Sequence, residues 1–242
     1  MTRRRFFVLP SALDTETIVF APREAHHMAT VLRLRAGARV IVFDGRREAE
    51  AELQSVDEAG VTARRVGPVR AASRPVEVAL LQGVARGPKM DLIVRMGTEI
   101  GLAEIFPVLT ARSLPDPGPA RLARWRRVAQ EAAKQCGRRD LPEVHAAADL
   151  RGALAALGPV DLFVIPWEEE TRPMGEVIAG TSFASAAILI GAEGGLTSEE
   201  VATARAAGGQ TVSLGPLILR TETAGLVTAA MLLYERLLRP RD

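Results

Sequence analysis

The sequence has 242 residues, of which 48% are hydrophobic and 25% are charged, and its net charge is +2. This composition is ordinary for a folded, soluble protein of one or two domains, and the lack of any run of eighteen apolar residues excludes a transmembrane helix. One cysteine, Cys136, excludes an internal disulfide, and with three histidines at unsuitable spacing it makes a metal site unexpected. The opening MTRRR is similar to a twin-arginine signal, but Asp14 and Glu16 interrupt any hydrophobic region after it, so we expect a cytoplasmic protein.

The first part of the chain predicts short strands. Segments rich in β-branched and aromatic residues are separated by Gly and Asp turn signals, and one short helix is expected at residues 23–35. This spacing favours a small β-barrel over half of a large sheet. Two prolines without periodicity indicate a linker near residues 67–75. The expected strands are RFFVLP, ARVIVFDG, REAEAELQSV and GVTARRV.

After the linker, buried strands alternate with helices. VEVALLQGVA predicts a strand, KMDLIVRMGTEIG predicts a helix that ends at Gly101, and AEIFPVLT predicts a second strand, which is the pattern of a βαβ unit. Further strands and helices follow, as far as a closing helix at about residues 221–238. This part of the chain therefore predicts an α/β layer with a parallel sheet.

Basic residues are unevenly divided along the chain. Residues 1–75 carry 13 arginines against 9 acidic residues, whereas residues 76–242 carry 18 basic against 20 acidic residues. A basic N-terminal module indicates a polyanionic partner, although a solvated arginine-rich surface would have the same composition. A second basic stripe, at residues 112–139, fits either a phosphate backbone or a solvated helix face.

A glycine-rich loop follows an apolar strand in AILIGAEGGLTSEEV. The glycines would let a ligand approach the backbone closely, and Thr197 with Glu200 predicts a capping box at the start of the next helix. Glu193 would repel a phosphate, and the segment matches neither a dinucleotide fingerprint nor a P-loop. The alternatives are a ligand loop and a plain strand-to-helix turn.

The segment LGPLILRTETAG, residues 214–225, places polar side chains between a strand and an apolar helix. Thr221 or Thr223 is expected to cap this helix, with Glu222 as a first-turn acid. Neither role explains Arg220, because a cation is unfavourable where a helix begins. We therefore expect Arg220 to meet an anion or a developing negative charge.

Six segments in order resemble a known family. IGAEGGLTSEE, LGPLILRTETA and EAAKQCGRR, preceded by HHMATVLRLRAG, KMDLIVRMGTEIGLAEIFP and TARS, are similar to the bacterial 16S ribosomal RNA uridine-N3 methyltransferases of the SPOUT superfamily. The resemblance runs almost end to end. It implies S-adenosyl-L-methionine as cofactor, 16S rRNA or the small ribosomal subunit as partner, and a homodimer. It also implies a PUA-like RNA-binding β-barrel at residues 1–70 and an α/β domain with a trefoil knot at residues 75–242.

The resemblance also implies roles for individual residues. Arg220, Thr221 and Glu222 would be catalytic and face the target base, with Arg220 stabilising negative charge on the uracil carbonyls as N3 loses its proton. Glu222 would be either the base or a group that positions Arg220. The methyl donor would be held by Ile165, Pro166, Gly191, Glu193, Gly194, Leu214, Gly215, Ile218 and Leu219. The residues expected to contact RNA are Arg3, Arg4, Arg5, Arg33, Arg35, Arg86, Lys89, Gln135 and Arg138.

Three positions depart from the family pattern. Ala192 stands where the family usually has proline, Leu217 where it often has arginine, and Met96 where a lysine is expected; the last two remove possible RNA contacts. Two other functions stay open, namely a SPOUT enzyme with a different rRNA or tRNA target and a non-catalytic RNA-binding assembly factor. A dinucleotide-dependent dehydrogenase is disfavoured because its glycine fingerprint is missing.

Overall fold

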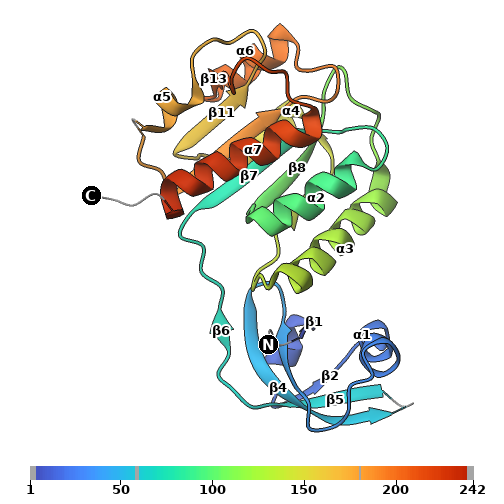
Figure 1. The fold of residues 1–242 in the computed structure, drawn as a ribbon. Coiled ribbons are helices and arrows are strands. Elements are labelled where there is room, and N and C mark those ends of the chain that lie inside the picture. The colour runs from blue at the N-terminus through green and yellow to red at the C-terminus, as the bar shows by residue number, and fades with distance from the viewer. Residues whose placement is uncertain (1–3, 58–59, 180, 239–242) are drawn as a thin grey trace. The chain divides into compact units, whose positions relative to one another are not determined.

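Two compact units make up the chain. The first comprises residues 1–73 and 130–141, and the second comprises residues 74–129 and 142–242. The change of unit at residues 73–74 falls within the linker expected at residues 67–75. The first unit also takes in the end of one helix and the loop that follows it, which the sequence did not indicate. The computed structural model describes residues 4–57, 60–179 and 181–238 (Figure 1).

The first unit is built on a sheet that is mostly antiparallel. The sheet order is β1-β3-β4-β5-β2, with β6 beside β4, and only β1 and β3 among these pairs run parallel. Along β4, the alternate residues Ala49, Ala51 and Leu53 are buried in the core, as the two-residue period of a strand dictates. The described strands are β1 (Arg5–Phe7), β2 (Thr17–Val19), β3 (Arg39–Phe43), β4 (Arg47–Asp57), β5 (Gly60–Arg65) and β6 (Arg70–Ala71).

Short helical segments complete this unit. The helix expected at residues 23–35 ends earlier, at Val31, and Arg33 has a φ of +50°, a left-handed conformation that a helix cannot continue through. Residues 32–38 therefore form a loop between the helix and β3. The helical segments are η1 (Pro10–Leu13), α1 (Pro22–His26) and η2 (His27–Val31).

The second unit contains the parallel sheet that the sequence predicts. The sheet order is β10-β8-β7-β12-β11-β13, with β9 beside β8, and every pair recorded in it is parallel. Six of the seven residues of β7 are buried, which is why this strand reads as a continuous apolar run. The strands are β7 (Glu77–Gly83), β8 (Glu104–Leu109), β9 (Glu143–Val144), β10 (Ala148–Asp149), β11 (Leu162–Pro166), β12 (Ser185–Ile190) and β13 (Gln210–Val212).

Helices cover both faces of this sheet and give it two cores. Val78 and Leu80 of β7 pack with α2, α3, α5 and α7, whereas Ala79 and Leu81 pack with α4 and α6. Figure 1 shows α2 and α7 lying across the same face. The helical segments are α2 (Lys89–Ile100), α3 (Gly118–Cys136), α4 (Leu150–Leu157), α5 (Met174–Ala179), α6 (Ser198–Ala206), α7 (Thr221–Leu233) and η3 (Tyr234–Leu238).

Residues in the sequence mark the end of α2 and the start of α6. Gly101 has a φ of +117° and ends α2, since glycine adopts this left-handed conformation without strain. Thr197 and Glu200 form the expected capping box at the start of α6, where each side chain accepts a backbone N–H of the other residue. Over the part of the chain that is described, no helix has both the length and the apolar character to cross a membrane.

Candidate active site

Loops at the ends of β11 and β12 and before α7 enclose a cavity of about 450 Å³. It brings together eight of the residues expected at the catalytic and donor sites, although they come from three separate segments. Its lining includes Pro166, Gly191, Glu193, Gly194, Ile218, Leu219, Arg220 and Thr221, together with Lys89, Glu168, Ile190, Ala192, Gly195, Leu196 and Ala224.

A second cavity of about 160 Å³ adjoins the first and shares part of its wall. Leu214 and Gly215 line this smaller cavity, and Pro166, Ile218 and Leu219 line both. Ile165 lines neither cavity, because it is fully buried in the core between the sheet and α6. It therefore supports the wall at Pro166 rather than forming it.

Backbone packs closely against backbone at Gly191 in the loop of residues 191–195 and at Gly83 beside that loop. A Cβ atom added to Gly191 would lie 2.5 Å from the carbonyl carbon of Gly195. From the other side, a Cβ atom added to Gly83 in β7 would lie 2.4 Å from the backbone nitrogen of Ala192. A side chain at either position would therefore displace the loop, and glycine keeps its backbone close to β7.

Neighbouring segments hold this loop in place by hydrogen bonds. The Arg112 guanidinium donates to the carbonyl oxygen of Gly194 at 2.6 Å, and the backbone N–H of Arg86 donates to the Glu193 carboxylate at 2.9 Å. Arg112 belongs to the TARS segment, which contributed to the resemblance without being assigned a site role. Its contact with a glycine carbonyl has no signature in the sequence.

A lysine joins two carboxylates at the edge of the larger cavity. The Nζ atom of Lys89 lies 3.1 Å from Glu193 and 3.3 Å from Glu222. Hydrogen bonding to Glu193 raises the pKa of Lys89 against the opposing effect of burial. Burial alone would raise the pKa of Glu193, but hydrogen bonds from Arg86 and Lys89 outweigh it and lower that pKa. Lys89 thus takes part in the cavity wall rather than standing free for RNA.

Arg220 is the N-cap residue of α7, and its side chain makes no capping hydrogen bond. This differs from the expectation that Thr221 or Thr223 would cap the helix, because α7 already begins at Thr221. Arg220 is exposed, and its guanidinium has no hydrogen bond or ion pair with any described residue. Glu222 pairs with Lys89 rather than with Arg220, so a role in positioning Arg220 directly is not supported. The Arg220 guanidinium thus has no partner among the described residues, although it lies at the N-terminal end of α7, where a positive charge is unfavourable.

The Thr221 hydroxyl is engaged inside the fold. It donates to the carbonyl oxygen of Gly191 at 2.6 Å and accepts from the side-chain amide of Gln82 at 2.8 Å. Thr221 is buried and Gln82 is fully buried, so the hydroxyl is not free to contact a base. The structure thus gives this hydroxyl two partners within the fold, and the catalytic role expected for Thr221 stays a prediction. Gln82 was missed; its only sequence signal is an isolated amide within an apolar strand.

The loop after β11 is fastened by Glu170. Hydrogen bonds from the Thr211 hydroxyl, at 2.5 Å, and from the backbone N–H groups of Arg172 and Thr171 lower the pKa of Glu170 to about 2. The carboxylate is thus ionised at neutral pH and ties the loop to β13. Glu168, two residues earlier, is exposed and lines both cavities.

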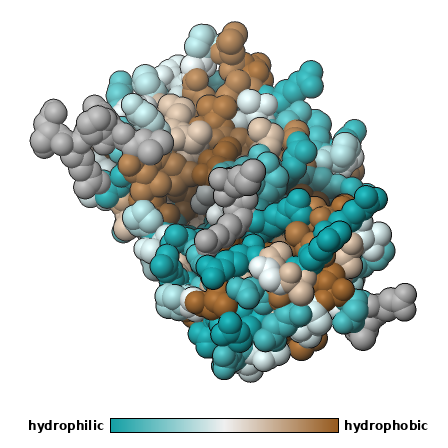
Figure 2. Space-filling view, turned by 60° about the horizontal axis from the view of Figure 1, so that its bottom comes forward, coloured by the Kyte–Doolittle hydropathy of each residue, from teal (hydrophilic) through white to brown (hydrophobic). Residues whose placement is uncertain are grey.

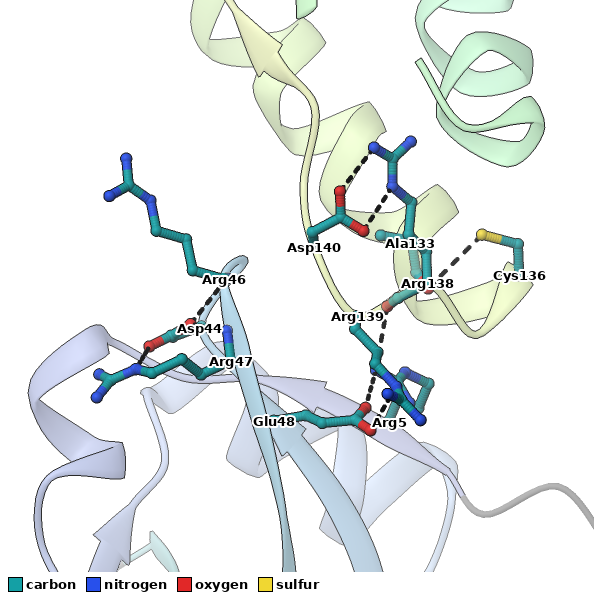
Figure 3. A network of polar contacts seen from close by, with 10 residues as sticks. All are labelled: Arg5, Asp44, Arg46, Arg47, Glu48, Ala133, Cys136, Arg138, Arg139 and Asp140. Carbon is teal, nitrogen blue, oxygen red and sulfur yellow. Dashed lines mark hydrogen bonds and ion pairs between the residues drawn. The ribbon is translucent and has the colours of Figure 1, made fainter. Parts of the chain in front are cut away.

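Arginines expected to contact RNA fall into two groups. Arg5 and Arg138 are largely buried in ion pairs, Arg5 with Glu48 and Arg138 with Asp140, each at 2.8 Å (Figure 3). Arg5 also donates to the backbone carbonyl of Arg138 at 3.0 Å. These contacts join the strand β1 to the loop after α3 within the first unit, so both guanidinium groups have partners within the fold, and their contact with RNA stays a prediction.

The remaining expected RNA residues are exposed or lie outside the described part of the chain. Arg33 and Arg35 are exposed in the loop before β3, and Arg4 is exposed with one contact to the carbonyl of Leu32. Gln135 and Arg86 are also exposed, each within its own unit. Arg3 lies outside the described residues.

One carboxylate-histidine cluster lies elsewhere in the second unit. Ligand atoms of Glu104, Glu143 and His145 lie within 4.8 Å of one another. His145 lies 2.7 Å from Glu104 and stacks on the ring of Phe106. Its contacts within the fold account for its position, so the cluster does not by itself indicate a metal site.

Comparisons with known proteins bear on both units. Residues 72–233 match the family model of the RNA methyltransferase domain, and residues 20–64 match that of the RNA methyltransferase PUA domain. Ribosomal RNA small subunit methyltransferase E of Bacillus subtilis (strain 168) is 32% identical over 92% of this chain and 91% of its own length. The protein of that name from Synechocystis sp. is 33% identical over 94% of this chain and 76% of its own length.

A solved structure agrees with these sequence matches. Ribosomal RNA small subunit methyltransferase E from Neisseria gonorrhoeae, bound to S-adenosyl methionine, has a TM-score of 0.86 at 28% identity. The match covers 97% of this chain and 98% of that one. The chain therefore belongs to the RNA methyltransferase family whose members include ribosomal RNA small subunit methyltransferase E.

Proposed function

We propose that this protein transfers a methyl group from S-adenosyl-L-methionine to N3 of a uridine in small-subunit (16S) ribosomal RNA. The observation that carries the proposal is an exposed guanidinium, that of Arg220, at the rim of a glycine-walled cavity and without a partner among the described residues. The name shared by the relatives supports the assignment of small-subunit rRNA as the substrate, and the S-adenosyl methionine bound to the Neisseria gonorrhoeae protein supports the assignment of the methyl donor.

The cavity suits an adenosyl sulfonium compound. Its volume of about 450 Å³ lies within the usual range for small-molecule sites. Apolar side chains and bare backbone form much of its wall, which fits adenine and a thioether better than a polyphosphate. When bound, the donor supplies an activated methyl group on a positively charged sulfur. The residues proposed to hold it are Pro166, Gly191, Glu193, Gly194, Leu214, Gly215, Ile218 and Leu219, with Ile165 behind them.

Arg220 is proposed to act on the uridine. The N3 atom is blocked in a paired base, so the target must be unstacked or unpaired at the site. N3 would lose its proton to solvent water and take the methyl group from the sulfonium, which would leave as S-adenosylhomocysteine. The negative charge that develops on the neighbouring carbonyl oxygens would be stabilised by the Arg220 guanidinium. Glu222 is already engaged with Lys89 at 3.3 Å, so we assign it to positioning Lys89 and, through Lys89, Glu193.

The substrate assignment is tested by mapping methylated nucleotides. Ribosomal and transfer RNA from cells with and without the gene would be digested and compared by mass spectrometry. We expect an N3-methyluridine to be lost from small-subunit rRNA and restored by the wild-type gene. If the methylated nucleotide is lost from large-subunit rRNA or from a tRNA, that RNA is the substrate and the assignment to 16S rRNA is wrong. If no methylated nucleotide is lost, the enzymatic function is contradicted.

The first unit is proposed to bind RNA as a PUA-like module, corresponding to residues 1–70, with the methyltransferase domain at residues 75–242. We expect the double variant Arg33→Ala/Arg35→Ala to bind rRNA more weakly and with a smaller dependence on salt. Each phosphate contact contributes a slope of about 0.7–0.9 in log K against log salt, so two lost contacts reduce it by roughly 1.5. The measurement is a filter-binding titration at several salt concentrations.

A matched control removes two arginines from the same unit. Arg23 and Arg39 are exposed but paired with Glu131 and Glu52. Arg23→Ala/Arg39→Ala should therefore change the salt slope much less, although it removes the same charge. Equal slopes for the two double variants would mean that Arg33 and Arg35 contribute only net charge.

We also propose a homodimer formed through α5, α7 and η3. Val227, Met231 and Tyr234 are 37%, 39% and 55% exposed and border a hollow of about 450 Å³. Figure 2 shows apolar side chains gathered on one face of the second unit. An exposed apolar patch of this kind is typical of a protein interface.

The dimer is tested by placing a charge in that patch. Met231→Glu should shift the sedimentation coefficient from dimer to monomer, because a carboxylate buried without a partner is strongly unfavourable. Met96→Glu is the control, since Met96 is similarly exposed, at 36%, but lies on α2 outside the hollow. A monomeric wild-type protein, or an unchanged Met231→Glu dimer, would contradict this interface.

A further inference from the structure

We propose that Gln82 and Thr221 form a buried clamp that positions Arg220 relative to the methyl-donor loop. This inference rests on the proposed function, because it concerns the site at which Arg220 acts. Neither residue is a catalytic residue here, since neither side chain is free to touch the base. Their role is to fix the distance between two segments that must work together.

The clamp connects three segments that are far apart in the chain. Gln82 belongs to β7, Gly191 begins the donor loop after β12, and Thr221 begins α7. The Gln82 amide nitrogen donates to the Thr221 hydroxyl at 2.8 Å and lies 3.4 Å from the Gly191 carbonyl oxygen. The Thr221 hydroxyl completes the ring by donating to that same carbonyl at 2.6 Å.

Only one orientation of the Gln82 amide satisfies this arrangement. Its nitrogen lies near the carbonyl oxygens of Gly83 and Gly191, at 3.2 Å and 3.4 Å. The amide oxygen in that place would meet two acceptors, which is repulsive. The hydroxyl hydrogen of Thr221 must then point to Gly191, because its oxygen accepts from Gln82. Each group thus fixes the next.

Burial makes these hydrogen bonds costly to break. Gln82 is 0% exposed and Thr221 is 7% exposed. The oxygen of the Gln82 amide has no hydrogen-bond partner among the described atoms, so a fully buried amide is retained here although one of its polar atoms is unsatisfied. An apolar side chain would avoid that cost. The amide at this position is explained if it is needed to hold Thr221, the residue next to Arg220, in place.

The test compares two hydroxyl deletions within the same helix. Thr221→Val removes the hydroxyl of the clamp. Thr228→Val removes a hydroxyl that is also buried, at 0% exposure, and that donates to the carbonyl of Ala224 in its own helix at 2.7 Å. Turnover at saturating donor, calorimetric affinity for S-adenosylhomocysteine and the melting temperature are measured for each.

We expect Thr221→Val to lower kcat at least about 10-fold and to weaken the affinity for S-adenosylhomocysteine, because small displacements of positioning groups are expensive in rate. Gln82→Met should do the same, and the double variant should be little worse than either single one, since both act through one network. Thr221→Ser keeps the hydroxyl and should retain most of the rate. Thr228→Val should match wild type in kcat and affinity, whatever its melting temperature.

Three results would overturn the clamp. The first is that Thr221→Val and Thr228→Val have the same kcat and the same affinity for S-adenosylhomocysteine. The second is that the effects of Thr221→Val and Gln82→Met multiply in the double variant. The third is that Thr221→Ser is as impaired as Thr221→Val. If Thr221→Val does not fold, Gln82→Asn replaces it, because asparagine is one methylene shorter and its amide no longer reaches Thr221. Its kcat and affinity are then compared with those of Thr228→Val. If Arg220→Ala is inactive but the clamp variants are fully active, the clamp alone is refuted. A fully active Arg220→Ala would refute the role of Arg220, whereas the proposed function is refuted only if no methylated nucleotide is lost from cells without the gene.

Discussion

Replacing Arg220 by alanine is expected to lower kcat by about 10²–10³-fold while leaving the affinity for S-adenosylmethionine nearly unchanged. Removal of a single preorganised donor that stabilises developing charge typically has this effect. Arg220 suits such a role because its guanidinium is exposed and makes no hydrogen bond or ion pair with another described residue. Methylation of isolated small subunits measures the rate, and calorimetry measures donor binding.

Two further variants separate geometry from charge. Arg220→Lys keeps a positive charge but loses the planar pair of donors, so it should recover only part of the activity. Arg151→Ala removes an exposed arginine from α4, remote in sequence from the cavity wall, and should behave as wild type. Full turnover by Arg220→Ala with normal donor binding would eliminate Arg220 as the stabilising group.

Replacing Gly191 by alanine is expected to weaken donor binding by roughly 10- to 100-fold. The new methyl carbon would lie 2.5 Å from the Gly195 carbonyl carbon and 2.8 Å from the Leu196 nitrogen, and both neighbours are backbone atoms that cannot turn aside. Overpacking of this kind costs about 1–3 kcal/mol, and each 1.4 kcal/mol corresponds to about tenfold in affinity. Calorimetry with S-adenosylmethionine measures the change.

The neighbouring glycine provides the control. A methyl carbon at Gly194 would lie 3.0 Å from Cδ and 3.1 Å from Cβ of Arg112, which is a looser contact than the 2.5 Å at Gly191, and no backbone atom is among its three nearest neighbours. Gly194→Ala should therefore bind the donor several-fold better than Gly191→Ala does. Gly175→Ala, where nothing lies within 4 Å, should match wild type. Wild-type affinity in Gly191→Ala would mean that the loop is more adaptable than its packing indicates.

The fold was predictable from the sequence where local signals were strong. The alternation of apolar strands with helices after residue 75 indicated the parallel sheet, and Gly101 and the Thr197–Glu200 pair marked helix ends that the structure contains. Short elements were missed, among them α5 and β9, because pairs or single turns have too little periodicity to detect. The helix before β3 was predicted too long, since nothing in its sequence marks the left-handed Arg33.

Predictability of the site was limited to the residues that face the cavity. Glycines after a strand and a misplaced arginine can be recognised because each breaks a local rule. Contacts such as Gln82 with Thr221, or Lys89 with Glu222, join positions 139 and 133 residues apart along the chain and depend on the tertiary fold. The contacts of Thr221 could not be predicted for this reason: its neighbours in sequence, Arg220 and Glu222, are charged, but its neighbours in space are a buried amide and a carbonyl.

The first unit is made of two stretches of the chain, residues 1–73 and 130–141, so the first stretch alone is not the whole unit. Glu24 is buried and pairs with Lys134 at 2.8 Å, although the two residues are 110 positions apart. A polypeptide emerging from the ribosome therefore exposes the acid long before its lysine has been synthesised. A fragment cut at residue 73 would contain every strand of the unit and still lack the cation that neutralises its buried carboxylate. The N-terminal module is thus completed only once the middle of the methyltransferase domain has been made.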